Sequence, residues 1–260
     1  MSRALPWLGA TAILLVLLGA WWLYTAVSGI DPLLLPSPPD VAASLWDDRA
    51  LLWDDFVVTA GEVLLGMAIA AVAGFVLPVA LHLSLPLRRS VYPLVVASQA
   101  IPIVVFAPIL VTWLGYGIAP KLVIVALVAF FPIVVTTLDA LARVDPELGK
   151  LLRTLGASRL RVLRHVELPA ALPGLLTGAK LAAAVAVIGA VFAEWAGSSS
   201  GLGHLVLTQL PQLRTELVFA AALILSAFAI ALFGLLTLVE RLVVPWAHES
   251  PSRSRQGRTR

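Results

Sequence analysis

Long apolar stretches alternate with short polar segments along the chain. Stretches free of Asp, Glu, Lys and Arg cover 4–30, 63–87, 90–120, 122–138 and 217–239, and one more, 168–193, is interrupted only by Lys180. A helix of roughly 20 apolar residues crosses about 30 Å of hydrocarbon, and backbone groups in lipid must form their hydrogen bonds within the protein. The pattern therefore predicts an all-α polytopic membrane protein with about six transmembrane helices.

The six spans are expected at about 6–28, 57–81, 91–114, 121–141, 172–195 and 217–244. The first belongs to an N-terminal transmembrane anchor, 1–28, which we expect to be retained because its apolar run exceeds the usual signal-peptide core of about 7–15 residues. An extracytoplasmic segment, 29–55, then leads into the main transmembrane domain, 56–246. The tail, 247–260, is rich in Ser and Arg and is expected to be disordered in the cytoplasm.

Composition supports the same class of protein. Apolar residues make up 60% of the 260-residue chain, charged residues make up 13%, and the mean hydropathy is +0.97. Soluble domains average about 45–50% apolar and about 25% charged residues, so the excess apolar surface must face lipid. The absence of cysteine excludes thiolate metal sites. We expect no catalytic residue, no metal and no nucleic-acid partner.

The basic residues sort onto one side of the membrane. Fourteen of the eighteen Lys and Arg residues fall on alternate connections and at the inner end of the last span: Arg3, Arg88, Arg89, Arg143, Lys150, Arg153, Arg159, Arg161, Arg164, Arg241, Arg253, Arg255, Arg258 and Arg260. Cytoplasmic loops carry an excess of these residues. This predicts that both termini and the loop over 142–171 are cytoplasmic.

That long loop, hereafter the elbow (142–171), predicts two short helices joined at a glycine. Asp145 followed by Pro146 is a strong helix start, and Gly156 can end the helix in a left-handed conformation. Ser158 can then cap a second short helix. The first helix carries one apolar stripe at helical spacing, made of Leu148, Leu151, Leu152 and Leu155. From the residues alone, the stripe either packs against the inner ends of the spans or docks a partner.

Motifs in and around the elbow resemble a known family. Gly156, nine further residues and then Val166-Glu167-Leu168-Pro169 resemble the cytoplasmic "EAA" signature of bacterial ATP-binding-cassette (ABC) importer permeases. The Glu-Ala-Ala positions of that signature read Lys150-Leu151-Leu152 here, which leaves the glycine intact but removes the family's acidic residue. The segments 99–117 and 193–203 are similar to the nitrate, sulfonate, taurine and hydroxymethylpyrimidine branch of the family.

The resemblance implies a permease with the MetI-like fold in the bacterial inner membrane, working as a homodimer. It also implies two ABC ATPase subunits docked on the elbows and an extracytoplasmic substrate-binding protein. The chain has no Gly-x-x-x-x-Gly-Lys-[Ser/Thr] phosphate loop, so we expect no cofactor, with ATP bound by the partner. The residues expected to couple to the ATPases are Leu148, Leu151, Leu152, Leu155, Gly156, Ala157, Ser158, Leu168 and Pro169.

Polar and proline residues of two spans are candidates for the translocation path. Pro102 and Pro108 fit a kinked, pore-lining helix or a packing kink. Ser98 and Gln99 beside them can bond a substrate or a neighbouring helix, and Glu194 is an intramembrane acid near the outer end of its span. Two lysines of the spans are expected to place their ammonium groups at the membrane interface. Lys180 extends towards the inner interface, and Lys121 lies among lipid headgroups.

The function expected from these features is inward transport of a small polar solute, with a pyrimidine-type thiamine precursor as the best candidate. A permease for sulfonate, taurine or nitrate is the alternative within the family. An ion-coupled secondary transporter is the alternative of another class, disfavoured because the few ionisable residues cluster at span ends rather than at mid-membrane. A membrane-embedded enzyme is disfavoured by the lack of clustered His, Asp or Cys residues.

Overall fold

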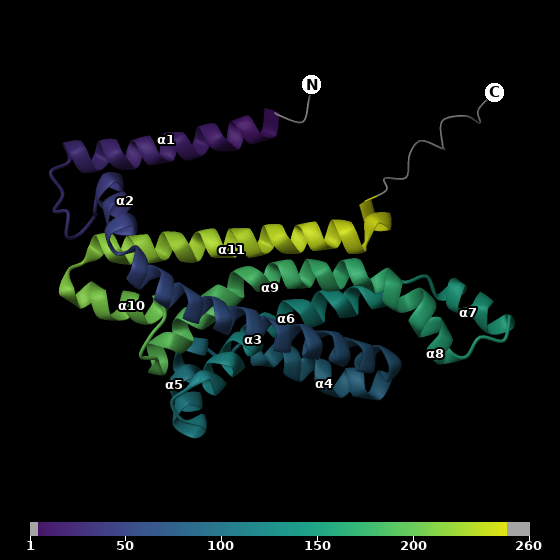
Figure 1. The fold of residues 1–260 in the computed structure, drawn as a ribbon. Helices are drawn as coiled ribbons and strands as arrows, with labels where there is room; N and C mark the ends of the chain where they lie inside the picture. The colour runs from purple at the N-terminus through teal and green to yellow at the C-terminus, as the bar shows by residue number, and fades with distance from the viewer. Residues whose placement is uncertain (1–4, 249–260) are drawn as a thin grey trace, which may run out of the picture. The chain divides into compact units, whose positions relative to one another are not determined.

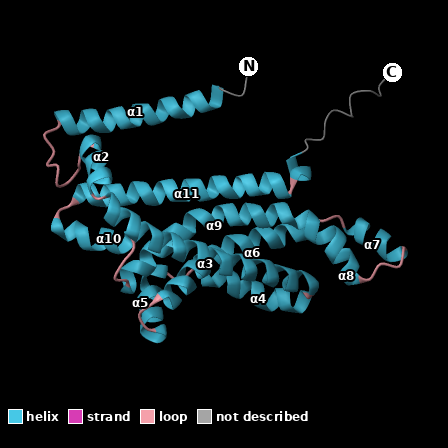
Figure 2. Cartoon of the chain, in the orientation of Figure 1, coloured by secondary structure: helices cyan, strands magenta, loops and turns pink. Residues whose placement is uncertain are grey.

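The computed structural model describes residues 5–248, and every regular element within this range is a helix (Figures 1 and 2). The α-helices are α1 (Leu5–Val27), α2 (Pro38–Asp47), α3 (Arg49–Leu83), α4 (Leu85–Ser98), α5 (Ile103–Leu114), α6 (Ile118–Ala142), α7 (Pro146–Thr154), α8 (Arg159–Val162), α9 (Leu168–Gly197), α10 (Leu202–Gln209) and α11 (Thr215–Val243). The expected disordered tail lies, from residue 249 onwards, outside the described residues.

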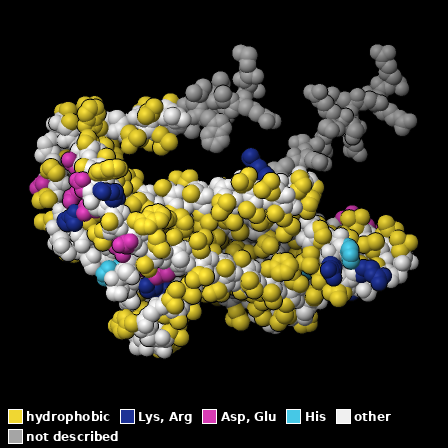
Figure 3. All heavy atoms as spheres, in the orientation of Figure 1, with side chains coloured by type: hydrophobic (Ala, Val, Ile, Leu, Met, Phe, Trp, Pro, Cys, Tyr) yellow, Lys and Arg dark blue, Asp and Glu magenta, His cyan; other side chains and the backbone are white. Residues whose placement is uncertain are grey.

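Four helical segments are long and apolar enough to cross a membrane: α3, α6, α11 and the continuous run Arg159–Gly197 that contains α9. The pair α4 and α5 supplies a fifth span if its two halves are taken together. The N-terminal helix α1 carries an apolar segment over Thr11–Val27 whose large side chains are mostly exposed. The four or five spans found lie at the positions of five of the six expected ones. Hydrophobic side chains cover much of the visible surface of the long helices (Figure 3).

The third span is broken rather than kinked. It was expected as one helix over 91–114, but α4 ends at Ser98, α5 starts at Ile103, and the two helices differ in direction by 101°. Pro102 lacks the backbone N–H that would continue the helix, and its ring disfavours helical geometry in the preceding residue. The second candidate, Pro108, lies inside α5 without ending it.

The chain forms two compact units. One combines the chain up to Ala60 with Ser198–Ala227, and the other combines Gly61–Gly197 with the chain from Phe228 onwards. In the first unit, the side chain of Arg214 donates a hydrogen bond of 2.8 Å to Asp48, and the backbone N–H of Gly201 donates one of 2.7 Å to Asp55. These contacts hold the polar connections of the unit to the beginning of α3.

The second unit is built around the close contact of α6 and α9, which run side by side (Figure 1). Gly178 makes this contact possible, because a Cβ atom there would lie 2.2 Å from Thr136 Oγ1 and 2.9 Å from the carbonyl oxygen of Pro132. A Cβ at Gly174 would lie 2.4 Å from the Cβ of Ala140. Small residues permit such backbone approach between membrane helices. The elbow joins the end of α6 to the beginning of α9.

Candidate functional site

The elbow forms the predicted helix–glycine–helix. Asp145 caps α7, since its Oδ1 accepts a 2.9 Å hydrogen bond from the N–H of Glu147. Gly156 follows with φ +83°, in the left-handed region that favours glycine. Ser158 then caps α8, and a π-helical turn, Leu163–Glu167, continues directly into α9. Each boundary is set by a local capping residue, which is why the sequence predicted it.

The apolar stripe on α7 is largely uncovered by the described part of the chain. Leu148, Leu151 and Leu155 are 48%, 57% and 76% exposed, and Leu152 is half-buried. The residues that pack the elbow against the spans are instead Val162 and Leu163, which are buried. The stripe therefore presents an apolar surface on an otherwise basic segment. Lys and Arg side chains lie beside apolar ones at this end of the molecule (Figure 3).

Glu167 ties the elbow to a third helix. Its carboxylate forms an ion pair with Arg159 at the start of α8, and its Oε2 lies 3.2 Å from Nε2 of His82 in the last turn of α3. The Glu167 side chain is only 12% exposed. Sequence analysis placed this residue inside the EAA-like signature but gave it no partner, because His82 is 85 residues away in the chain. The elbow is thus attached to α3 as well as to α6 and α9.

A buried polar cluster lies among α3, α6 and α9. Nζ of Lys121 on α6 donates a 2.6 Å hydrogen bond to Oε1 of Glu62 on α3, and their side chains are 9% and 3% exposed. Glu194 on α9 is fully buried beside Glu62. The expectation that Lys121 lies among headgroups was therefore wrong. The packing of three helices encloses its ammonium group and supplies a carboxylate partner.

Lys180 has a partner that the sequence did not indicate. Its Nζ donates a 2.6 Å hydrogen bond to Oε2 of Glu240 in the last turn of α11. The two side chains are 16% and 9% exposed. Buried charges in a membrane protein are usually paired with each other, and the pair here joins two helices 60 residues apart in the chain.

The candidate path residues lie on or beside three helices, α4, α5 and α9. Ser98 and Gln99 end α4 at the break, where Ser98 Oγ donates a 2.7 Å hydrogen bond to the carbonyl oxygen of Val95. Pro102 and Pro108 are exposed on α5, whereas Glu194 is enclosed within the cluster with Glu62. The helices α5 and α9 pack against each other, since Ala107 and Leu110 of α5 belong to the same core cluster as Ala193 of α9.

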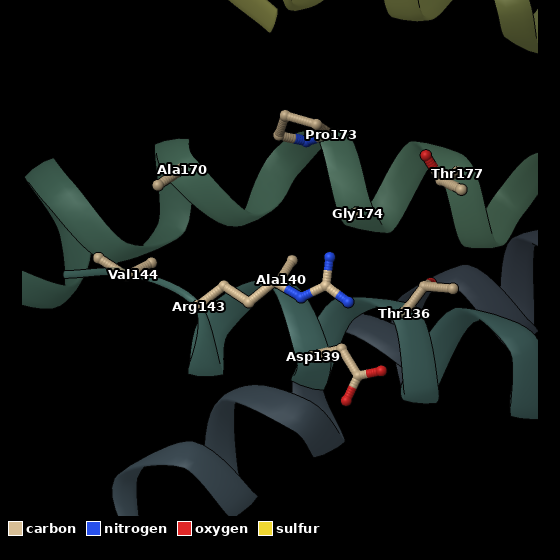
Figure 4. Close-up of a pocket in the computed structure, with 9 residues that line it drawn as sticks. All are labelled: Thr136, Asp139, Ala140, Arg143, Val144, Ala170, Pro173, Gly174 and Thr177. Carbon is tan, nitrogen blue, oxygen red and sulfur yellow. The ribbon is translucent and has the colours of Figure 1, made fainter.

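A cleft of about 490 Å³ opens between the ends of α6 and α9 that the elbow joins (Figure 4). Arg143 extends between the two helices towards Gly174, while the carboxylate of Asp139 points away from α9 (Figure 4). Thr136 and Thr177 add hydroxyl groups to the lining. Neither Asp139 nor Arg143 forms an ion pair with a described residue. The cleft is therefore lined by a carboxylate, a guanidinium group and hydroxyl groups, and the carboxylate and the guanidinium group are not paired with each other.

No group of three or more His, Cys, Asp or Glu residues within the described chain has the arrangement of a metal site. The features that remain are an exposed apolar stripe on the elbow, paired charges between helices and a polar cleft beside the elbow.

Residues 51–245 match the sequence profile of the family described as "Binding-protein-dependent transport system inner membrane component". The chain belongs to this family. It is the membrane-spanning permease of an ABC importer, a multi-pass protein of the bacterial inner membrane. Such a permease works with an ATPase and a substrate-binding protein.

The relatives of the permease include proteins named for their substrates. It is 34% identical to the formylaminopyrimidine transport permease protein ThiX of Halalkalibacterium halodurans, over 95% of this chain and 98% of that one. It is 35% identical to the riboflavin transport system permease protein RibX of Chloroflexus aurantiacus, over 93% and 91% of the two chains. It is 30% identical to the taurine transport system permease protein TauC of Escherichia coli, over 91% and 88%. The expected branch of the family is confirmed.

The fold of the permease matches a chain of the MetNI methionine ABC transporter, solved in inward-facing conformations. The TM-score is 0.62 with 21% sequence identity, and the match covers 76% of the permease and 97% of the solved chain. The expected MetI-like, all-α fold is therefore confirmed.

Proposed function

We propose that this permease carries a small heteroaromatic solute into the cell, with a pyrimidine-type thiamine precursor as the best candidate. The relative named for formylaminopyrimidine aligns with this permease over nearly the whole length of both chains. A second relative is named for riboflavin, which is also a ring compound. The inner cleft offers Asp139, Arg143 and threonine hydroxyls, which suit a solute with both hydrogen-bond donors and acceptors.

Uptake in reconstituted vesicles tests this substrate class. The permease, its ATPase and its binding protein are reconstituted with ATP on the ATPase side, and uptake of labelled formylaminopyrimidine is compared with uptake of taurine and nitrate. Preferential, ATP-dependent uptake of the pyrimidine supports the proposal. Preferential uptake of taurine, another sulfonate or nitrate would favour the alternative within the family, which the 30% identity to TauC keeps in view.

The same vesicles distinguish an ion-coupled secondary transporter. Such a carrier works from an ion gradient alone, whereas the proposed importer requires ATP, the ATPase and the binding protein together. The charged groups buried in the spans are engaged with each other, as in Lys121–Glu62 and Lys180–Glu240. Gradient-driven uptake without ATP would contradict the importer mechanism.

The exposed leucine stripe on the elbow is the observation that carries the mechanism. We infer that two ATPase subunits dock on the elbows of a permease homodimer, and that ATPase closure moves each elbow as a rigid lever. The docking and joint residues are Leu148, Leu151, Leu152, Leu155, Gly156, Ala157, Ser158, Leu168 and Pro169. Large exposed apolar side chains are typical of interaction sites, and Glu167 supplies a route from the elbow to α3.

We further propose that the translocation path passes the break in the third span. Ser98, Gln99, Pro102 and Pro108 line it in this proposal, and Glu194 controls its outer end. Irregular backbone at membrane depth is tolerated where it lines a cavity or is enclosed by protein, which supports a path at the α4–α5 break. Substituting Gln99 with alanine is expected to change the solute affinity of uptake without affecting ATPase docking.

The proposed orientation places the elbow and both termini in the cytoplasm. Because the sequence has no cysteine, a single cysteine at Thr154 on the elbow and another at Gln212 on an expected outer connection each give a unique label. An impermeant thiol reagent added to intact cells should modify the Gln212 position alone. Labelling at Thr154 in intact cells would reverse the orientation.

A further inference from the structure

Behind the elbow lies a second pocket, which the coupling mechanism does not use. It has a volume of about 460 Å³, within the range of about 300–1,000 Å³ typical of small-ligand sites. Its walls come from the last turn of α3, the end of α6, and the inner faces of α7 and α8. The first turn of α4 closes one side with Arg88.

The pocket is strongly basic. Its cationic lining residues are Arg88, Lys150, Arg153 and Arg159, together with His82. The acidic lining residues are Asp145, whose carboxylate caps α7, and Glu167, which is bound to Arg159 and His82. Lys150 has its own partner, Glu147, at 2.7 Å.

Two of these cations are uncommitted. Neither Arg88 nor Arg153 forms an ion pair or hydrogen bond through its side chain with a described residue. They line the same pocket from different helices, α4 and α7. Two guanidinium groups lining one pocket suit a phosphate, which they bind by charge-assisted and often bidentate hydrogen bonds.

The position of the pocket indicates where that phosphate comes from. Two membrane-spanning helices end at the pocket, since His82 lies one residue before the end of α3 and Ala142 is the last residue of α6. This is the depth at which lipid headgroups lie. Immediately before Arg88 the chain exposes apolar side chains at Leu83, Leu85 and Leu87, which can contact acyl chains while the arginine binds the headgroup.

We propose that this basic pocket binds the phosphate headgroup of an acidic phospholipid from the cytoplasmic leaflet. The inference rests on the proposed cytoplasmic position of the elbow. Basic pockets between membrane helices on the cytoplasmic side bind such headgroups. The bound lipid brings the inner end of α3 and the elbow together through a shared anion, in parallel with the Glu167 ion pairs.

Lipid binding to the full-length permease tests the proposal. The purified chain in neutral detergent is titrated with short-chain phosphatidylglycerol or phosphatidylcholine, and occupancy is measured by native mass spectrometry. The wild-type chain is expected to bind phosphatidylglycerol more tightly. Each of Arg88→Gln and Arg153→Gln should weaken that binding about five-fold, and the double variant about 25-fold, as expected for removal of one or two cations near an anionic surface.

Arg161 and Arg164 provide the matched control. Both are exposed arginines in the second half of the elbow, and neither lines the pocket. The double variant Arg161→Gln, Arg164→Gln removes the same charge and should leave the phosphatidylglycerol preference unchanged. An equal loss in this control would show that binding follows the overall charge of the elbow, and would overturn the pocket.

Further measurements distinguish lipid binding from binding of a soluble anion, from loss of folding and from an elbow on the outer face. Displacement of phosphatidylglycerol by millimolar inorganic phosphate would identify a soluble anion as the occupant and overturn the lipid assignment. Circular dichroism and gel filtration of each variant show that lost binding is not lost folding. An elbow on the outer face would be detected by the cysteine labelling at Thr154, independently of whether the purified chain prefers the acidic lipid.

Discussion

Lys121 on α6 and Glu62 on α3 form a 2.6 Å ion pair that is enclosed by protein, although both residues lie on membrane-spanning helices. Glu194 on α9 is buried beside the same Glu62. Three helices therefore contribute polar groups to one buried cluster. Such contacts stabilise the arrangement only while all members are present, because an unpaired buried charge is costly.

Replacing Lys121 with methionine should destabilise the permease by about 3–5 kcal/mol, since it leaves the Glu62 carboxylate buried without its cation. Thermal unfolding in detergent measures the loss. The double variant Lys121→Met, Glu62→Gln removes both charges and should recover much of the stability. A double variant as unstable as the single one would contradict the ion-pair explanation.

Gly178→Ala should destabilise the α6–α9 contact by about 1–3 kcal/mol, the usual cost of overpacking a core. The added Cβ would lie 2.7 Å from the Cα of Ile133, which is backbone and cannot rotate away. Gly234→Ala on α11 is the control, because nothing lies within 4 Å of its added Cβ. Thermal stability of the two variants in the same detergent gives the comparison.

Gly156→Ala should cost about 1–2 kcal/mol for backbone reasons alone, because the residue has φ +83° and open space around it. Gly149 lies in the same elbow inside α7, where alanine is favoured by about 0.5–1 kcal/mol and would meet only an ordinary contact 3.6 Å away. ATP-driven uptake should fall for Gly156→Ala and persist for Gly149→Ala. Equal uptake by both variants would argue against a required left-handed joint.

Glu167→Gln should uncouple ATP hydrolysis from transport, because it removes the negative charge that holds Arg159 and His82. Residues that carry coupling between sites contribute about 0.5–2 kcal/mol, so uptake per ATP should fall about two- to thirty-fold. ATPase co-purification should remain at the wild-type level, since the leucine stripe is untouched. Loss of ATPase binding would assign Glu167 to docking instead.

The double variant Leu151→Asp, Leu155→Asp should abolish ATPase co-purification. Both side chains are exposed, on α7 and at its C-terminal cap, and a carboxylate buried without a partner in an apolar interface is costly. Leu210→Asp and Leu213→Asp, exposed leucines of the expected outer connection, provide the control and should retain the ATPase. Retention by the α7 variant would place the docking surface elsewhere.

The sequence predicted the features that depend on neighbouring residues. The spans follow from continuous apolar runs, and the elbow follows from Asp145, Gly156 and Ser158, each of which sets a boundary through its own backbone or side chain. The same reasoning gave no partner for Lys121 or Lys180. Their partners lie 59 and 60 residues away, so only the packing of the helices reveals that these charges are paired.

The broken third span shows an intermediate case. Pro102 indicated an interruption, but a proline alone does not specify whether a helix bends slightly or ends. The 101° change of direction arises over the four residues from Gln99 to Pro102, where turn-type hydrogen bonds such as Ala100 N–H to Ala97 O replace the helical ones. The size of such a change depends on how the two halves pack.

The close approach at Gly174 and Gly178 determines where the permease can deform. The elbow leaves α6 and returns into α9, and these two helices are in contact along glycine-lined surfaces that leave no room to slide. Together they constitute one stiff hairpin, so a force on its tip displaces both arms without changing their spacing. We therefore expect the permease to deform at 99–102, where the helical hydrogen bonds are interrupted between α4 and α5. The movement that each cycle of solute passage needs is expected at this break.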